Sequence, residues 1–390
     1  SDSIQATFKM TTFMKSNTSQ AAKNQYANNK VEHVGSFLRP LKLKKARYDF
    51  ADRVIYEETL RQVEDAEIDN LIDIQLDNDC TIMTDGDFRR GWWHYDFLEQ
   101  FDGIQGYKTR DGLQFKGVIS KAYDVRVTGK IDFPEDHPSL AHYRFLHQAI
   151  DGFATAKFTL PSPNMMLYPH LRNNHHYAER LAEYVEDLGQ AYQKAIQALY
   201  EQGCRYLQIN DEFWAYLCDE EQRGKELASG MNPDDLADFA VQTLNIALAN
   251  KPEDLVVALH INRGNFLSSW LYQGGYTAIE SFIFEKLHNI DRYLLEFDTE
   301  RAGGFEPLAK LQGTNAEVFL GLISTKIETV EDKTKLIAKI QQAAAYLPLE
   351  QLGLCPQSGF ASMEEGNRIS YDTQWKKLKL MNEIVQEVWG

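Results

Sequence analysis

Short apolar runs rich in β-branched residues alternate with longer segments of helical periodicity along this chain. Strands that alternate with helices form a parallel sheet, because a crossover through a helix returns the chain in the same direction. Eight candidate strands suit a closed (β/α)8 barrel better than an open doubly wound sheet. The candidate strands lie at residues 31–37, 80–85, 155–160, 204–209, 255–260, 293–297, 317–323 and 351–355.

Three segments between these runs carry clear helix signals. Residues 178–202 place apolar side chains at steps of three and four, and Gly203 follows as a left-handed C-terminal cap requires. A second helix is predicted over 233–250, because Asn232 is a good N-cap and a proline follows it at the first helical position. A third helix is predicted over 328–345.

The domain organisation follows from the same pattern. We expect residues 30–390 to form a single barrel domain, with a β-hairpin inserted near 104–132, where period-two runs and glycines are frequent. Residues 1–29 are interpreted as an N-terminal extension that is partly ordered or derived from processing or cloning. An open sheet stays the alternative, but it calls for a glycine-rich phosphate loop, and neither GxGxxG nor GxxxxGK occurs.

Composition and charge favour a small-molecule partner. The net charge of −16 opposes binding to nucleic acid or to an anionic membrane surface, because both are polyanions. No apolar run of about 18 residues is present to span a bilayer, and the N-terminus lacks the apolar run of a secretory signal. We therefore expect a cytoplasmic protein, and the oligomeric state stays open. Four cysteines without CxxC spacing are expected to be reduced: Cys80, Cys204, Cys218 and Cys355.

Polar residues follow directly after seven of the predicted strands. One such residue alone is more often a helix cap or a loop charge than part of a site. In a barrel of parallel strands, however, all of these positions converge on one end, where active sites of this fold are built. The positions are Gly35 and Ser36, Asp85 to Asp87, Asn210 to Glu212, His260 and Asn262, Glu296, Ser324 to Lys326, and Cys355 to Ser358.

Seven motifs in this order resemble the cobalamin-independent methionine synthase superfamily, and most closely the short bacterial homologues that carry only its C-terminal catalytic barrel. The resemblance covers about residues 30–390 and implies a (β/α)8 barrel. It also implies a zinc ion that binds the thiol of homocysteine, and a methyl group that passes to the thiolate. The donor is 5-methyltetrahydrofolate in the long enzymes, and for the short homologues the donor, folate-type or other, stays open. The motifs are HVGSFLRP, TDGDFRRGWWHYDFLEQFDGI, CRYLQINDEFWAYL, HINRGN, LEFDTERAGGFEPL, LGLISTK and LGLCPQSGFASMEEGN.

The metal ligands that the resemblance implies are only half retained. His260 and Glu296 match the family's histidine and glutamate, whereas Asn262 and Ser358 stand where its two cysteines are expected. A neutral amide and a hydroxyl are weak ligands for zinc, which prefers thiolates and imidazoles. We therefore expect a zinc site of much reduced affinity. Cys355, three residues before Ser358, is interpreted as a buried apolar residue and not as a relocated ligand.

The substrate contacts that the resemblance implies are better preserved. Gly35 and Ser36 would hold the carboxylate of an amino acid through backbone N–H groups and a hydroxyl. Asp87 would take the ammonium group, and Asn210 stands where a second acid is expected. Trp92 is a candidate substrate contact, although core or rim packing is the commoner role of such a residue.

Two further residues are candidates for catalysis. Lys326 falls near the family's proton-donating histidine and could support an anion as a cation. Asp211 follows Asn210, and with Glu212 it could replace the missing acid after a small shift.

Two functions therefore stay open. One is a methionine-synthase-like transfer of a methyl group to a thiol such as homocysteine. The other is a zinc-free barrel that binds an amino-acid-like or pterin-like ligand without methyl transfer.

Overall fold

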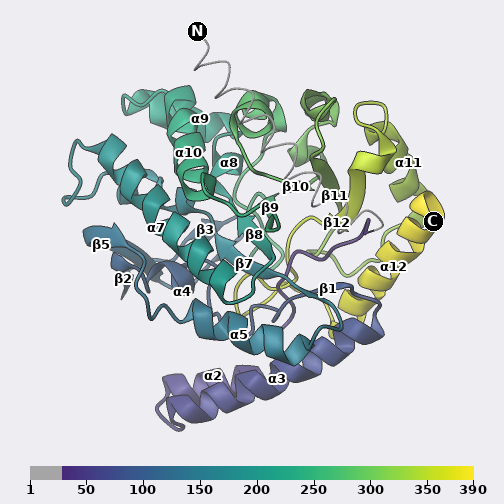
Figure 1. Cartoon of the computed structure of the whole chain (residues 1–390), viewed down its shortest axis with the longest axis horizontal. Helices are drawn as coiled ribbons and strands as arrows, with labels where there is room; N and C mark the ends of the chain where they lie inside the picture. The colour runs from purple at the N-terminus through teal and green to yellow at the C-terminus, as the bar shows by residue number, and fades with distance from the viewer. Residues whose placement is uncertain (1–28) are drawn as a thin grey trace.

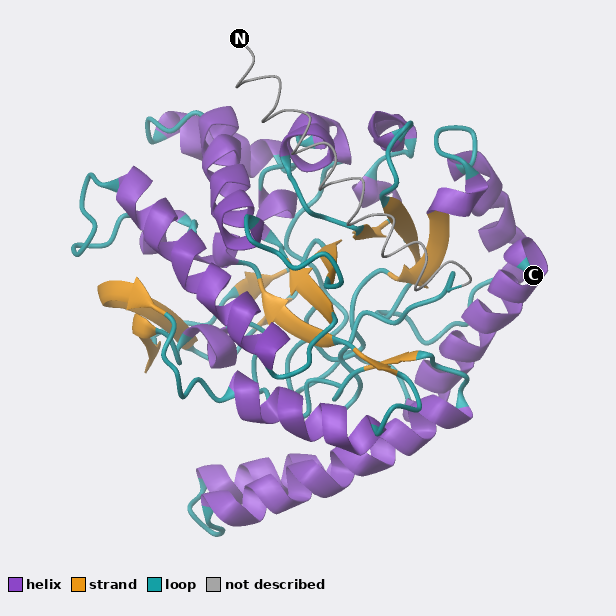
Figure 2. Cartoon of the chain, viewed as in Figure 1, coloured by secondary structure: helices purple, strands orange, loops and turns teal. Residues whose placement is uncertain are grey.

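Strands at the centre of the molecule form a closed barrel surrounded by helices in the computed structural model, which describes residues 29–390 (Figures 1 and 2). Six consecutive strands are hydrogen bonded in sequence order, and every neighbouring pair is parallel. They are β7 (Phe158–Pro161), β8 (Tyr206–Asn210), β9 (Val256–Ile261), β10 (Arg292–Glu296), β11 (Glu317–Ile323) and β12 (Leu352–Pro356).

Shorter pairings close the ring. Strand β1 (Ile82–Met83) pairs in parallel with β6 (Thr155–Ala156), which leads into β7 after one residue. The first predicted run, 31–37, lies between β12 and the chain after β1, through single parallel bridges. The predicted (β/α)8 barrel is therefore confirmed, and each of the eight predicted runs contributes to the ring. The two bridges join Val31 to Leu354 and Ser36 to Gly86.

The helices cover the outside of the barrel. All three predicted helices are present as α7, α10 and α11, and Asn232 caps α10 by accepting a hydrogen bond from the backbone N–H of Asp234. Gly203, two residues beyond α7, has a φ of 105°, in the left-handed region that favours glycine. No helix within residues 29–390 is long and apolar enough to cross a membrane. The α-helices are α2 (Leu41–Ala51), α3 (Glu57–Asp77), α4 (Tyr95–Leu98), α5 (Ser139–Ile150), α6 (Pro169–Arg172), α7 (Leu181–Glu201), α8 (Phe213–Tyr216), α9 (Glu220–Ala228), α10 (Pro233–Leu248), α11 (Lys333–Ala343) and α12 (Tyr371–Trp389).

The predicted hairpin is inserted after β1. Strand β2 (Asp102–Lys108) pairs antiparallel with β5 (Tyr123–Asp132), and a smaller hairpin of β3 (Gln114–Phe115) and β4 (Val118–Ile119) lies between them. This smaller hairpin packs on the loop after β9, where the ring of Phe115 lies 5.2 Å from that of Phe266. The insertion thus reaches the end of the barrel at which the strands terminate. The predicted extension, 1–29, lies outside the described residues except for its last residue.

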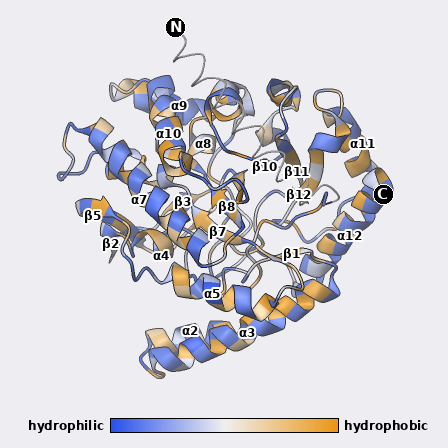
Figure 3. Ribbon diagram, viewed as in Figure 1, coloured by the Kyte–Doolittle hydropathy of each residue, from blue (hydrophilic) through white to orange (hydrophobic). Residues whose placement is uncertain are grey.

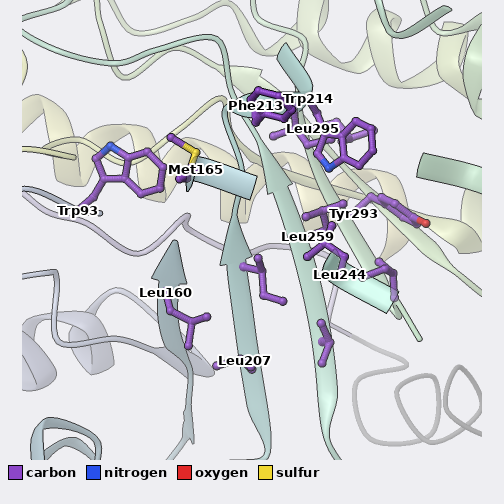
Figure 4. Packing of buried hydrophobic residues seen from close by; sticks show 14 of the residues in the cluster. Trp93, Leu160, Met165, Leu207, Phe213, Trp214, Leu244, Leu259, Tyr293 and Leu295 are labelled. Atoms are coloured by element: carbon purple, nitrogen blue, oxygen red, sulfur yellow. The ribbon is translucent and has the colours of Figure 1, made fainter. Parts of the chain in front are cut away.

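Two apolar layers hold the barrel together. Outward side chains of the strands pack under the helices, and Figure 4 shows Leu244 of α10 in one cluster with Leu259 and Tyr293. Figure 3 shows hydrophilic residues on the outward surface of α7 and hydrophobic residues along the strands behind it. A second cluster fills the barrel interior with residues from seven of the eight strand positions, two of them from β9, and it includes Cys355, as predicted. Its members are Val34, Ile82, Tyr206, Val256, Ala258, Leu294, Phe319 and Cys355.

Buried charges cross the amino-terminal half of the barrel interior. The Glu32 carboxylate accepts hydrogen bonds from Lys157 at 2.8 Å and from Arg292 at 3.0 Å. Arg292 also donates to Glu317 at 3.1 Å. These four side chains come from four different strand positions and are almost completely buried. Removing one partner would leave an opposite charge buried without compensation.

Replacing Lys157 with Met tests this buried network. We expect the substitution to lower the free energy of unfolding by about 3 kcal/mol, because the Glu32 carboxylate loses its closest cation. Urea unfolding followed by circular dichroism measures the change. The matched control is Lys45→Met, which removes an exposed pair with Asp49 and should cost less than about 1 kcal/mol. Equal losses in the two variants would contradict a stabilising role of the network.

Candidate functional site

The polar positions predicted from the strand ends converge on one end of the barrel. Hydrogen bonds join several of the loops directly. The backbone N–H of Asp211 donates to the carbonyl of His260 at 2.8 Å, and the backbone N–H of Arg263 donates to the Glu296 carboxylate at 2.5 Å. Ser36 lies beside Gly86 through the bridge described above. We call this end of the barrel the mouth. It is formed by the polar residues that follow the strands: Gly35 and Ser36, Asp85 to Asp87, Asn210 to Glu212, His260 and Asn262, Glu296, Ser324 to Lys326, and Cys355 to Ser358.

Ser36 is held between three segments of the mouth. Gly35 has a φ of 133°, and its carbonyl accepts a hydrogen bond from the Thr84 hydroxyl at 2.6 Å. The Ser36 hydroxyl oxygen accepts the backbone N–H of Ala361 at 3.3 Å. A Cβ on Gly359 would lie 1.7 Å from that oxygen, so this position needs glycine. The Ser36 hydroxyl therefore has a defined place and keeps its own proton for donation.

Asp87 lies next to Ser36 in a left-handed backbone conformation, with a φ of 61°. Its carboxylate accepts a hydrogen bond from the Thr159 hydroxyl at 3.1 Å. Arg90 is 3.8 Å away, but its guanidinium donates to the carbonyl of Thr159 at 2.5 Å. Asp87 is therefore a buried carboxylate with hydrogen-bonding capacity left for a ligand.

His260 and Asn262 are hydrogen bonded to each other. The Nδ1 atom of His260 donates to the carbonyl of Leu294 at 3.1 Å, which leaves Nε2 as an acceptor. The Asn262 amide nitrogen donates to this Nε2 atom at 3.3 Å, and its oxygen accepts the N–H of Gly264 at 2.8 Å. Burial lowers the pKa of His260 to about 3, so the ring is neutral. The nitrogen that would bind a metal is thus already occupied by an amide hydrogen.

Glu296 is surrounded by positive and hydrogen-bonding groups. One oxygen accepts the Arg263 N–H, and the other lies 3.7 Å from the Lys326 ammonium. Lys326 itself pairs more closely with Asp298, at 2.8 Å. Burial raises the pKa of Glu296, and the Lys326 charge opposes that rise. The structure therefore brings the predicted residues Glu296 and Lys326 together in one charged cluster.

Three consecutive residues after β8 have different environments. The Asn210 oxygen accepts a hydrogen bond from Gln208 at 2.8 Å. The Asp211 carboxylate caps α8 through the N–H of Phe213 and accepts the amide of Asn164, both at 3.0 Å. Burial raises the pKa of Asp211 to about 6. These contacts occupy Asp211 structurally, and its catalytic role stays a prediction.

Glu212 differs from both of its neighbours. Its carboxylate makes no hydrogen bond and no ion pair with any residue of 29–390, although the residue is only 6% exposed. Phe213 and Trp214, which follow it, are anchored in the core (Figure 4). Burial and the nearby charges of Glu296 and Asp211 raise the pKa of Glu212 to about 8. The sequence signalled Glu212 only as part of an acidic pair after a strand.

An amide network that sequence reasoning missed joins three loops of the mouth. Asn265 donates to the carbonyl of Gly359 and accepts from Asn367, both at 2.7 Å. Gln357 donates to the Thr325 hydroxyl at 2.8 Å. Each residue alone reads as an ordinary polar loop residue, so its partners are visible only in the folded chain. The network fixes the loop that carries the buried Ser358.

Trp92 lies at the rim of the mouth. Its ring packs with Tyr123 of β5 at 6.4 Å and with Tyr95 at 5.0 Å. It also contacts the small cluster of Phe115, Phe266 and Met363 beneath the inserted hairpin. Packing between the barrel and the insertion is therefore the observed environment of Trp92. Contact with a substrate stays a prediction.

Potential metal ligands are few in this region. Among residues 29–390, no three side chains of the types His, Cys, Asp and Glu are grouped so that they could hold a metal ion. The four cysteines are free thiols, and Cys355 lies inside the barrel. The two donors retained from the implied ligand set are therefore His260 and Glu296.

Residues 31–386 match the family model of the catalytic domain of the cobalamin-independent synthases. The chain belongs to this family. The chain is similar to two uncharacterized proteins of Bacillus subtilis (strain 168), YxjG and YxjH. YxjG is 42% identical over 92% of this chain and 94% of its own length, and YxjH is 41% identical over 94% and 96%.

Solved structures agree with the barrel fold of the family. A Listeria monocytogenes protein assigned as a vitamin-B12-independent methionine synthase shares 37% identity, with a TM-score of 0.74 over 92% of this chain and 97% of that one. A B12-independent methionine synthase from Shewanella sp. W3-18-1, solved in complex with selenomethionine, shares 17% identity, with a TM-score of 0.69 over 92% and 97%. The second likeness concerns the fold alone.

The unpartnered Glu212 predicts a pH-dependent stability. Its pKa is about 8 in the folded chain against an ordinary value of 4.5, so the native state binds this proton more tightly than the unfolded state. The stabilisation is fully present below pH 4.5 and is lost as the pH rises through 8. Between about pH 5 and pH 8.5 we expect the parent chain to lose about 4 kcal/mol more than Glu212→Gln in urea unfolding.

The control for this measurement is Glu253→Gln, which changes an exposed glutamate. Its stability should follow the parent chain at every pH. If Glu212→Gln also follows the parent chain, the Glu212 carboxyl is not held in the environment described here.

Proposed function

We propose that this protein is a methionine-synthase-like S-methyltransferase that binds a small thiol-bearing amino acid, such as homocysteine, and methylates its sulfur. The observation that carries the proposal is the position of the buried Ser36 at the mouth, bridged to Gly86, whose neighbour in the chain is the buried Asp87. A hydroxyl whose hydrogen is not yet donated can form a hydrogen bond to a ligand carboxylate. A buried carboxylate can accept hydrogen bonds from a ligand ammonium group. Membership of the cobalamin-independent synthase family supports this choice of ligand.

The residues present do not fit the zinc ion that the family implies. His260 Nε2 is engaged by Asn262, and the Glu296 carboxylate by Arg263 and Lys326. The remaining two positions, Asn262 and Ser358, supply no thiolate. The proposed transfer therefore involves no metal. Positive charge from Lys326 would favour the thiolate form of a bound thiol, because a nearby cation lowers a thiol pKa.

A second function is favoured by one specific observation. The hydrogen bond between Asn262 and His260 occupies the nitrogen that would otherwise act in thiol chemistry. The protein would then bind an amino-acid-like or pterin-like ligand without transferring a methyl group. Mass spectrometry of the thiol after incubation with methyl donors separates the two functions, since only a methyltransferase adds the mass of one methyl group. In both, the partners are small molecules and the expected location is the cytoplasm.

Ser36→Ala and Asp87→Asn test the amino-acid site. Each variant should bind homocysteine at least about tenfold more weakly in titration calorimetry, a loss of about 1.4 kcal/mol for one charge-assisted hydrogen bond. Asparagine tolerates the left-handed backbone at position 87, so the fold should be retained. Asp111→Asn, at an exposed position of the insertion, should bind like the parent chain. Unchanged binding in both mouth variants would remove the basis of the proposal.

The combined change Asn262→Cys and Ser358→Cys tests the assignment of the lost ligands. The parent chain should retain well under one zinc per chain after dialysis against a chelator, because two thiolates are replaced by neutral groups. The double variant should retain close to one zinc, with His260 freed from its amide partner, and each single variant an intermediate amount. Elemental analysis measures the content. A folded double variant without zinc would show that positions 262 and 358 are not the ligand positions.

A further inference from the structure

Glu212 is a buried carboxylate for which the described chain provides no cation. It lies two residues after β8, and its carboxylate makes no hydrogen bond or ion pair within residues 29–390. The charged groups that influence it most are Glu296 and Asp211, which are both acidic. A buried carboxylate without a partner is costly, so such a group either stays protonated or binds a positive ligand.

Tyrosines from two other loops pack on the residues that follow Glu212. The Tyr168 ring lies edge-on, 5.2 Å from the ring of Phe213, and the Tyr272 ring lies 5.7 Å from that of Tyr216. Tyr95 follows the second strand position, Tyr168 the third and Tyr272 the fifth. Burial and nearby negative charge, including that of Glu212, raise the phenol pKa of all three. The Tyr272 hydroxyl donates to the Tyr168 hydroxyl at 3.4 Å, and both rings are only partly buried. Tyr168 and Tyr272 therefore present partly exposed rings beside the segment that carries Glu212.

The cations of the mouth are engaged elsewhere. Lys326 pairs with Asp298, and Arg263 donates to the carbonyl of Gly274 at 2.7 Å. Arg90 donates to the carbonyl of Thr159. None of these cations contacts Glu212. A positive group that pairs with the Glu212 carboxylate must therefore come from a ligand.

We propose that Glu212, Tyr168 and Tyr272 bind a methylated onium cation, either a sulfonium or a quaternary ammonium, and that this cation is the methyl donor. The inference rests on the proposed function, because it names the second substrate of that methyl transfer. Aromatic faces attract cations whose charge is spread over methyl groups, and a carboxylate adds attraction without needing an N–H donor. A folate-type donor, which carries carboxylates, would bring negative charge toward Glu212, Glu296 and Asp211.

The transfer balances without a further reactant. The thiol first loses its proton to solvent, and the thiolate sulfur then attacks a methyl carbon of the donor. A sulfur–carbon bond forms while the bond from that carbon to the positive heteroatom breaks. The electron pair of the broken bond stays on the heteroatom, which leaves as a neutral thioether or tertiary amine. Neither an oxidant nor a reductant is required.

Titration calorimetry with matched probes tests the cation site. The probes are trimethylsulfonium, choline and 3,3-dimethyl-1-butanol, which has the shape of choline without its charge. The parent chain should bind both cations at least about tenfold more tightly than the neutral alcohol. Glu212→Gln should weaken cation binding by at least about tenfold, whereas Glu253→Gln should not change it. Tyr272→Leu should weaken binding and Tyr272→Phe should preserve it, since phenylalanine keeps the ring.

Unfolding curves of each variant show whether a loss of binding reflects a loss of structure. Cation binding that is equal in the parent chain and in folded Glu212→Gln would overturn the inference. So would binding of the neutral alcohol as tight as that of choline.

Homocysteine titrations of the same samples separate the inference from the proposed function. Homocysteine binding without cation binding overturns the inference and leaves the function in place. Cation binding that depends on Glu212 without homocysteine binding supports the cation site and contradicts the function. Incubating homocysteine with deuterated trimethylsulfonium or deuterated choline then identifies the heteroatom, because only the true donor class adds a labelled methyl group to the sulfur.

Discussion

A network of buried charges inside the barrel constrains the rest of this structure. Glu32 bridges Lys157 and Arg292, and Arg292 continues to Glu317, so strand positions distant in sequence are joined through side chains. Burying these charges is tolerable only while each keeps its partner. The parallel pairings of β7 to β12 satisfy this condition because they bring the first residues of several strands to one level. The same register places the strand ends together at the mouth.

The mouth shows the opposite electrostatic arrangement. Charges at the amino-terminal end are matched, whereas the carboxyl-terminal end holds acids with unused capacity, above all Glu212. Unpaired buried groups are unfavourable for stability and useful for binding, because a ligand can supply the missing charge. The amide network around Asn265 and the anchoring of α8 in the core keep these groups in place without a ligand.

The side chains at the positions where the family resemblance implies metal ligands have defined partners. The Asn262 amide makes two hydrogen bonds. It donates to the Nε2 atom of His260 and accepts the backbone N–H of Gly264 in the following turn. Lys326 lies near Glu296 with Asp298 as a second acidic partner. The changes thus form a consistent set in which hydrogen bonds and an ion pair hold residues that the family resemblance assigns to a metal. The synthase barrel is retained, and the side chains at these positions differ from those that the family resemblance implies.

The sequence by itself determined the barrel, its order of strands, the inserted hairpin and the convergence of polar residues at one end, because periodicity and strand ends are local features of the chain. It also identified Asn262 and Ser358 as departures from the family pattern. Only the tertiary structure decided the partners of each side chain. Asp211 turns to cap a helix and Glu212, one residue later, stays without a partner. That difference depends on contacts with distant segments such as Asn164, which local sequence does not encode.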